Sequence, residues 1–196
     1  GSWAFAYCSS LTSIVIPDAV TTIGSGAFLG CGNLTSIVIP DSVTTIGSEA
    51  FLSCDSLTSI VIPDSVTSIA DYAFRGCSSL ASIVIPDSVT SISSGAFAYC
   101  SSLTSVTIGD SVTSIGIWAF SGCGGLTSIT VDPNNSVYHS SGNCLIETES
   151  KTLIAGCSTS VIPADGSVTS IGSEAFHWCR SLASIVIPDS VTSIGE

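Results

Sequence analysis

The sequence predicts a solenoid, a coil whose successive turns stack along one axis, with each turn 23 residues long. Phenylalanine recurs at this interval from Phe5 to Phe120, and cysteine recurs at the same interval from Cys8 to Cys123. Close copies of residues 24–46 fill most of the chain. Apolar residues at fixed phases of such a period are typical of stacked repeats, in which each turn is buried against its neighbours.

Each unit begins with a short strand, which we expect at residues 13–16. Leu11, Ile14 and Ile16 form the order Leu-x-x-Ile-x-Ile, whose last three positions alternate, so that both isoleucines point inward. Pro17 ends the strand because it has no amide hydrogen to donate. This order is that of a leucine-rich repeat, and strands stacked in this way form a parallel sheet on one side of the coil.

The rest of the unit crosses the opposite side of the coil and returns. Val20 and Ile23 form a second apolar pair, expected in a short strand, and Gly24 permits the next bend. Residues 27–31, Ala-Phe-x-x-Cys, are compact enough for a 3₁₀ or helical turn. The predicted fold class is therefore a leucine-rich-repeat solenoid, with a parallel β-sheet on one side and short strands and 3₁₀ or helical turns on the other.

One segment interrupts the regular repeats. Residues 1–131 are regular, 132–166 are irregular, and a regular repeat resumes at 167–196. Within the irregular part, residues 144–146 and 152–154 flank a polar segment and are expected to form a β-hairpin insert. We expect the three parts to form one continuous solenoid. Both chain ends cut through a repeat, so we expect a fragment of a longer array whose uncapped turns associate end to end.

The composition excludes two classes of partner. Three Lys and Arg residues stand against fifteen Asp and Glu residues, which gives a net charge of −12. This charge repels nucleic acid and anionic membrane surfaces, so neither is expected as a partner. The mean hydropathy is high, at +0.63. The longest aliphatic runs are nevertheless triplets, far short of the ~20 residues of a spanning helix, so we expect no membrane insertion.

The nine cysteines are interpreted as packing residues. Six of them follow the repeat, and a buried thiol at one phase of every turn acts as a small hydrophobe with a weak S–H donor. The chain has no Cys-x-x-Cys motif and only two histidines, so no metal site and no cofactor are expected.

Three other repeated patterns have a structural interpretation beside a functional one. Asp18 and its equivalents form a column of carboxylates, which suits Ca²⁺ but also suits a Pro-Asp-Ser turn, and we favour the turn. The serines at the Ser13 phase have no histidine repeated beside them, so no enzyme is predicted. Outward threonines at the Thr21 phase form a lattice that leaves ice binding as a remote alternative, although such residues simply suit strands.

The unit Ala-Phe-x-x-Cys-x-x-Leu-Thr-Ser-Ile-x-Ile-Pro-Asp-Ser-Val-Thr-Ser-Ile-Gly resembles the BspA-like leucine-rich repeat family, and the resemblance covers essentially the whole chain. The insert resembles a variant unit of that family, through Asp-Pro-Asn-Asn at 132–135, Tyr-His-Ser-Ser at 138–141 and Lys-Thr-Leu-Ile at 151–154. The resemblance implies an extracellular or cell-surface protein that adheres to host proteins or to other cells, and it implies no catalytic residues. Gly109 departs from the expected proline. Cys144 and Cys157 stand where thiols are not expected, which leaves a disulfide between them open.

Comparison of the units with one another locates the candidate binding residues. Variation is concentrated around Ala-Phe-x-x-Cys, where aromatic residues and arginine appear, and these are common anchors of protein interfaces. We therefore predict a non-enzymatic binding or adhesion module, which engages a protein or cell-surface ligand. The alternatives are that the rings only shield the Phe and Cys rows, and that the chain is a structural spacer or stalk without a ligand of its own. The candidate binding edge comprises Trp3, Tyr7, Tyr72, Arg75, Tyr99, Trp118, His177, Trp178 and Arg180.

Overall fold

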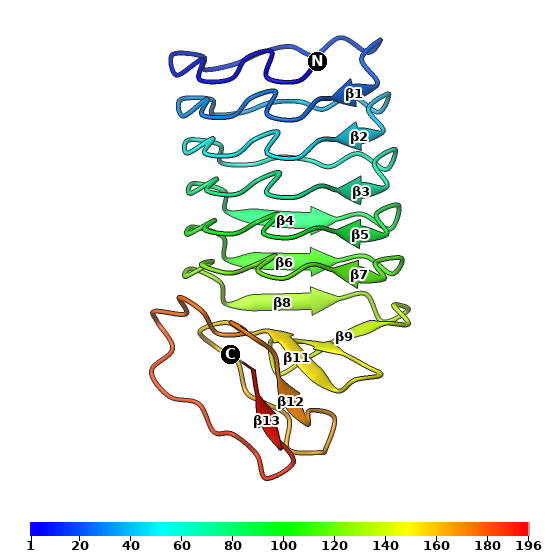
Figure 1. Cartoon of the computed structure of the whole chain (residues 1–196), viewed down its shortest axis with the longest axis vertical. Helices are drawn as coiled ribbons and strands as arrows, with labels where there is room; N and C mark the ends of the chain where they lie inside the picture. The colour runs from blue at the N-terminus through cyan, green and yellow to red at the C-terminus, as the bar shows by residue number, and fades with distance from the viewer. Residues whose placement is uncertain (196) are drawn as a thin grey trace.

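The computed structural model describes residues 1–195 and shows a solenoid of stacked turns, followed by a C-terminal part whose strands are tilted against the stack (Figure 1). Two parallel ladders run down the regular turns. A five-stranded sheet has the order β1-β2-β3-β5-β7, and a three-stranded sheet has the order β4-β6-β8. The first sheet contains β1 (Thr22–Ile23), β2 (Thr45–Ile46), β3 (Ser68–Ile69), β5 (Ser91–Ile92) and β7 (Ser114–Ile115), and the second contains β4 (Ser82–Ile85), β6 (Ser105–Ile108) and β8 (Ser128–Val131).

The strand register follows directly from the period. Ile83 pairs with Val106, and Val106 pairs with Ile129, so every step from turn to turn is 23 residues. Equivalent side chains therefore stack on one another, and the inward side chains of each strand form continuous columns. The strand expected at 13–16 is less extensive in the first turns than predicted, because Val15 forms only an isolated parallel bridge with Val38 there.

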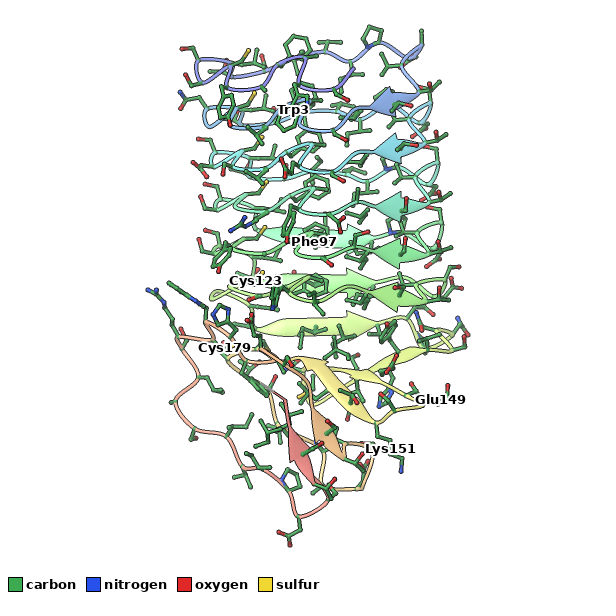
Figure 2. The ribbon with its side chains drawn as sticks, viewed as in Figure 1. Trp3, Phe97, Cys123, Glu149, Lys151 and Cys179 are labelled. Carbon is green, nitrogen blue, oxygen red and sulfur yellow. The ribbon has the colours of Figure 1, made fainter. Side chains whose placement is uncertain are left out.

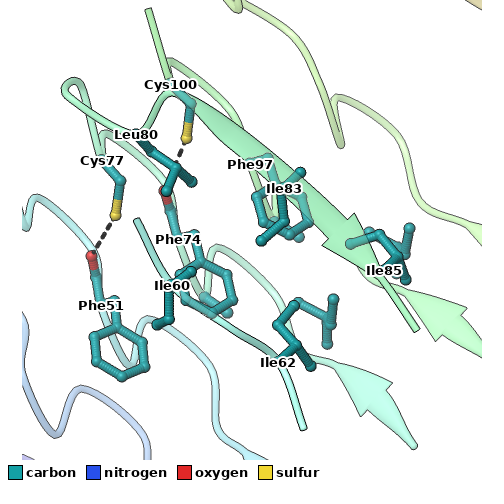
Figure 3. Close-up of a cluster of buried hydrophobic side chains, with 14 of the residues drawn as sticks. Phe51, Ile60, Ile62, Phe74, Cys77, Leu80, Ile83, Ile85, Phe97 and Cys100 are labelled. Atoms are coloured by element: carbon teal, nitrogen blue, oxygen red, sulfur yellow. Dashed lines mark hydrogen bonds between the residues drawn. The ribbon is translucent and has the colours of Figure 1, made fainter. Parts of the chain in front are cut away.

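The interior consists of these columns. Six phenylalanine rings, from Phe5 to Phe120, stack with centroids 5.2 to 5.7 Å apart and planes within 12° of parallel. Each buried cysteine of the column donates its S–H to the carbonyl oxygen of the phenylalanine one turn earlier, as from Cys77 to Phe51 at 3.2 Å (Figure 3). Leu80 and the strand isoleucines fill the remaining space beside the rings and are buried. The phase of each apolar residue thus assigns it to one column.

The Ala-Phe-x-x-Cys segment differs from the expected 3₁₀ or helical turn. It consists of overlapping four-residue turns, with bonds from the Leu29 amide to the Gly26 carbonyl and from the Cys31 amide to the Phe28 carbonyl. The alternate amides of Gly26, Phe28 and Gly30 donate instead to carbonyls of the next turn. Because these amides serve the neighbouring turn, they are not available for a continuous helical ladder, and this side of the coil has its own inter-turn hydrogen-bond ladder without strands.

The expected β-hairpin is confirmed and belongs to a larger sheet. β10 (Cys144–Glu147) pairs antiparallel with β11 (Thr152–Ala155), with an irregular register between Leu145 and Ile146. A strand that was not predicted, β9 (Tyr138–Ser141), pairs antiparallel with the other edge of β10. β12 (Ser170–Ile171) and β13 (Ser193–Ile194) then continue in parallel from β11. Residues of the insert and the resumed repeat, including Ile146 and Val168, form a second apolar cluster.

The division at residues 131 and 166 stays a prediction. Among residues 1–195 there is no helix with the length and apolar character that crossing a membrane requires.

Candidate functional site

Most candidate aromatic residues have an unusual backbone conformation. In the Ala-Phe segments, the residues two before and two after the phenylalanine have a positive φ, near +60° at Tyr72, Tyr99 and Trp118. Glycine occupies the same positions in other turns, as at Gly95, where φ is also +60°. A positive φ is uncommon outside glycine and is costly for bulky residues. It recurs here because the segment must direct alternate amides toward the next turn.

Each of four candidate rings lies against a glycine of the following turn. A Cβ atom at Gly95 would lie 2.5 Å from ring atoms of Tyr72, and one at Gly122 would lie 2.6 Å from the ring of Tyr99. The rings of Trp3 and Tyr7 cover Gly26 and Gly30 in the same way. One function of these rings is therefore to cover the backbone of the next turn. Their outer faces remain accessible, since the exposed fraction is 72% for Tyr7 and 39% for Tyr99.

Five candidate residues come together in one groove, which we call the edge groove. Its volume is about 300 Å³, and besides the five it is lined by Ala98, Ser121 and Glu174. Trp178 flanks it, with its ring edge-on to that of Tyr99 at a centroid distance of 6.1 Å. Trp3 and Tyr7 are not part of the edge groove, since they belong to the first turn, and Trp3 is near the top of the stack (Figure 2). The five candidates that line the groove are Tyr72, Arg75, Tyr99, Trp118 and His177.

The two arginines of the edge are held by aromatic rings. The guanidinium carbon of Arg75 lies 5.5 Å from the ring centre of Tyr72 and 5.3 Å from that of Tyr99. The guanidinium carbon of Arg180 lies 3.8 Å from the ring centre of Trp178. Within residues 1–195 neither arginine forms an ion pair or a side-chain hydrogen bond. Two of the three cationic residues of a chain with fifteen acidic ones thus have free N–H donors at this edge.

A polar cluster at the groove was not predicted. The hydroxyl of Ser121 lies 2.6 Å from Nδ1 of His177 and 3.3 Å from Oε2 of Glu174, and the same Nδ1 lies 3.5 Å from that Oε2. A hydrolytic triad requires one ring nitrogen toward the nucleophile and the other toward the acid. Here a single nitrogen contacts both groups, so the arrangement has the geometry of a hydrogen-bonded cross-link between two turns and not that of a triad.

A recess of about 200 Å³ adjoins the edge groove at the break in the regular stack. It lies between the turn of Phe120 and the resumed turn of Phe176, and Cys123 and Cys179, both labelled in Figure 2, contribute to its lining. The resumed turn keeps one regular contact, because the Gly122 amide donates to the His177 carbonyl at 3.3 Å. Both the groove and the recess are lined by Trp118, Ser121, Glu174 and His177.

The cysteines have the predicted packing role. Cys54, Cys77 and Cys100 are free and buried, and burial raises the pKa of each thiol, to about 12 for Cys54. Cys8, in the first of the described turns, is exposed. The insert thiols Cys144 and Cys157, whose pairing the sequence left open, are free in the structure.

Two members of the aspartate column accept hydrogen bonds. The carboxylate of Asp87 accepts one from the Asp110 amide, 23 residues later, and that of Asp110 accepts one from the adjacent Ser111 hydroxyl. In the part of the chain that the structure describes, no group of three or more His, Cys, Asp or Glu side chains is placed to hold a metal ion.

Comparison with solved structures gives several bacterial leucine-rich repeat proteins. A leucine rich cell surface protein from Faecalibacterium prausnitzii is 37% identical with a TM-score of 0.71, and the match covers 94% of this chain and 57% of that protein. A leucine-rich repeat protein of T. pallidum is 29% identical with a TM-score of 0.64, and the match covers 94% of this chain and 73% of that protein. The pneumococcal vaccine antigen PcpA is 20% identical with a TM-score of 0.73, and the match covers 94% of this chain and 58% of that protein. At this identity the likeness shows the fold alone.

Comparison with curated proteins finds no match. The family model described as "BspA type Leucine rich repeat region" matches residues 1–127, 44–164 and 150–196, with six copies. These matches extend over the regular turns, the insert and the resumed repeat. The chain therefore belongs to the BspA-type leucine-rich repeat family.

Proposed function

We propose that this chain is a non-enzymatic adhesion module of an extracellular or cell-surface protein, and that it engages a host or cell-surface protein through the edge groove. The observation that carries the proposal is the placement of Arg75. Its guanidinium lies between two tyrosine rings at the groove and has no acidic partner among residues 1–195. Arginine and aromatic residues around a recess are typical of the energetic centres of protein interfaces.

Two further observations support this proposal. The groove collects residues from consecutive regular turns and from the resumed repeat, which gives a contact area wider than a single turn. The description of the Faecalibacterium protein as a cell surface protein is consistent with an exposed location for this chain. A spacer without a ligand is the second candidate, and the rings that cover glycines in the next turn favour it, because covering the backbone needs no partner.

An adhesion assay separates the two candidates. Beads coated with the chain are applied to cultured epithelial cells, and the attached beads are counted for the parent and for Arg75→Ala and Trp118→Ala. Each of these variants is expected to reduce attachment at least tenfold, the effect of a ~1.4 kcal/mol loss at an anchor residue. Trp118 suits this test because it is 45% exposed and lines the groove.

The matched control is Trp3→Ala. Trp3 occupies the same phase as Trp118 with a similar positive φ, but it lies outside the groove. We expect this variant to attach as well as the parent. If the parent beads do not attach, or if Trp3→Ala lowers attachment as much as Trp118→Ala does, the edge groove is not the binding surface and the spacer is the better interpretation.

A further inference from the structure

The column of phenylalanine rings ends at Phe120. From Phe5 onward each ring stacks on the ring of the next turn, with centroids at most 5.7 Å apart. In residues 1–195 no ring stacks on Phe120 from the C-terminal side, although Phe176 has the equivalent phase in the resumed repeat. The recess of about 200 Å³ lies between these two turns, and Phe120 forms part of its wall.

Gly156 explains why the column ends there. In the regular turns a cysteine thiol donates to the phenylalanine carbonyl one turn earlier, but the Cys179 thiol donates to the Gly156 carbonyl at 3.6 Å. The ring of Phe176 also lies against Gly156, because a Cβ atom there would be 2.5 Å from its Cζ. Gly156 therefore takes the place of Phe120 as the partner of the Phe176 ring and the Cys179 thiol. The resumed turn packs on Gly156 and not on Phe120.

The recess has the size and lining of a site for one aromatic ring. Ile115, Phe120, Ile154, Ala155 and Ala175 supply apolar surface. An apolar cavity of about 150 Å³ is large enough to bind benzene, so the volume of this recess suffices for one ring with a polar substituent.

The polar groups of the recess define the substituent. The Ser121 hydroxyl, the Glu174 carboxylate and the His177 imidazole lie together where the recess meets the edge groove. A phenol hydroxyl both donates and accepts a hydrogen bond, so it complements a carboxylate acceptor beside a hydroxyl. An aliphatic or benzyl side chain would form no hydrogen bond with these groups, whereas a phenol hydroxyl can add one to the existing cluster.

We propose that the recess receives a tyrosine side chain of the bound protein, with its ring beneath Phe120 and its hydroxyl at the Ser121, Glu174 and His177 cluster. This inference rests on the proposed function, because it names the group by which the partner at the edge groove is anchored. Arg75 contacts the surface around this anchor, and the tyrosine fills the recess that adjoins the groove.

The test uses the whole chain and small probes, so it does not depend on the partner. The probe is p-cresol, with toluene and 4-methylcyclohexanol as comparators, and the readout is the shift of the Ala119, Ala155 and Ala175 methyl signals in NMR titrations. We expect p-cresol to bind with a Kd in the millimolar range, toluene to bind about threefold to tenfold more weakly, and the alicyclic alcohol to bind more weakly still. Equal shifts with all three probes, or no saturable shift with p-cresol, would overturn the proposal.

Two variants identify the site of the probe. Ala155→Leu places a larger side chain in the recess and should remove p-cresol binding, whereas Ala6→Leu, on the first turn, should leave it unchanged. Ser121→Ala retains the apolar walls, so it should lower the affinity for p-cresol toward that for toluene. If Ser121→Ala loses the preference for p-cresol over toluene, the result supports the proposed hydroxyl contact even if Ala155→Leu fails to fold. If this preference is unchanged, the result contradicts the hydroxyl contact.

The adhesion assay and the probe titration can fail independently. If p-cresol binds as expected while Arg75→Ala and Trp118→Ala attach normally, the recess is a ring site but the groove is not the adhesive surface. If the variants lose attachment while p-cresol does not bind, the proposed function stands and the tyrosine anchor is wrong.

Discussion

Substitution of Gly95 by alanine tests the contact between rings and glycines of successive turns. Gly95 has a φ of +60°, and a Cβ atom there would lie 2.5 Å from Cδ1 and Cε1 of Tyr72. The left-handed conformation costs an alanine about 1 to 2 kcal/mol. Displacement of the Tyr72 ring adds about 1 to 3 kcal/mol, as for an overpacked side chain. We therefore expect Gly95→Ala to lower the free energy of unfolding by about 2 to 5 kcal/mol.

Gly166 supplies a control for the backbone contribution. It has a φ of +85°, and a Cβ atom there would have nothing within 4 Å. Gly166→Ala should therefore cost only the conformational part, about 1 to 2 kcal/mol. In a Tyr72→Ala background the ring is absent, so Gly95→Ala should cost no more than Gly166→Ala does.

Urea unfolding followed by both circular dichroism and tryptophan fluorescence gives the free energies, and coincident curves show whether the transition is two-state. The coupling between Tyr72→Ala and Gly95→Ala in a double-mutant cycle should exceed about 1 kcal/mol. Additivity within about 0.5 kcal/mol, or equal costs at Gly95 and Gly166, would falsify the idea that the ring requires a glycine in the next turn.

Three further predictions concern the core, the thiols and the first turn. Ile85 is 1% exposed and Val84 is 62% exposed, so Ile85→Ala should destabilise by about 2 to 5 kcal/mol through the cavity it leaves, whereas Val84→Ala should cost under about 1 kcal/mol in the same urea assay. Burial raises the pKa of Cys54 and Cys123 from 9.0 to about 12. Above pH 9 the unfolded thiols lose protons that the folded ones keep. In thermal melts the contribution of each thiol to stability should therefore be constant from neutral pH to pH 9 and should then fall by about 1.4 kcal/mol per pH unit up to pH 12, with a smaller loss in the alanine variants. Phe5 is 39% exposed beside an open apolar recess of about 180 Å³. Sedimentation should therefore show concentration-dependent self-association of the chain, and Phe5→Glu should weaken this association. An ideal monomer at all concentrations would argue against association through the first turn.

The sequence predicted the solenoid because one period fixes every inter-turn register. Residues 23 apart must be neighbours once the turns stack, so the strand ladders and the Phe and Cys columns follow from position alone. The conformation of the Ala-Phe segment could not be predicted in the same way. Aromatic residues rarely adopt a positive φ, and local propensity therefore favoured a 3₁₀ or helical turn at these positions.

A signal for that conformation was nevertheless present in the sequence. Tyr72 is followed by Gly95 after one period, and Tyr99 is followed by Gly122 at a second phase, so a glycine follows each of these aromatic residues one period later. The edge groove was predicted only in part, because the grouping of the variable residues depends on how the resumed repeat docks. Ser121 and Glu174 are 53 residues apart, and no periodicity relates them.

The pairing of a ring with a glycine one turn later also bears on how such an array can evolve. Nearly identical repeats invite unequal recombination, in which one 23-residue unit is lost while every apolar column stays in phase. Loss of one unit between Tyr72 and Gly95 would put Trp118 in the turn that Tyr72 covers, where a side chain has no room. Lineages that keep a stable fold are therefore expected to gain or lose units only at breakpoints that leave each aromatic residue joined to its glycine. The turns of Phe5 and Phe28, and those of Phe74, Phe97 and Phe120, are then inherited as groups although the sequence repeats singly.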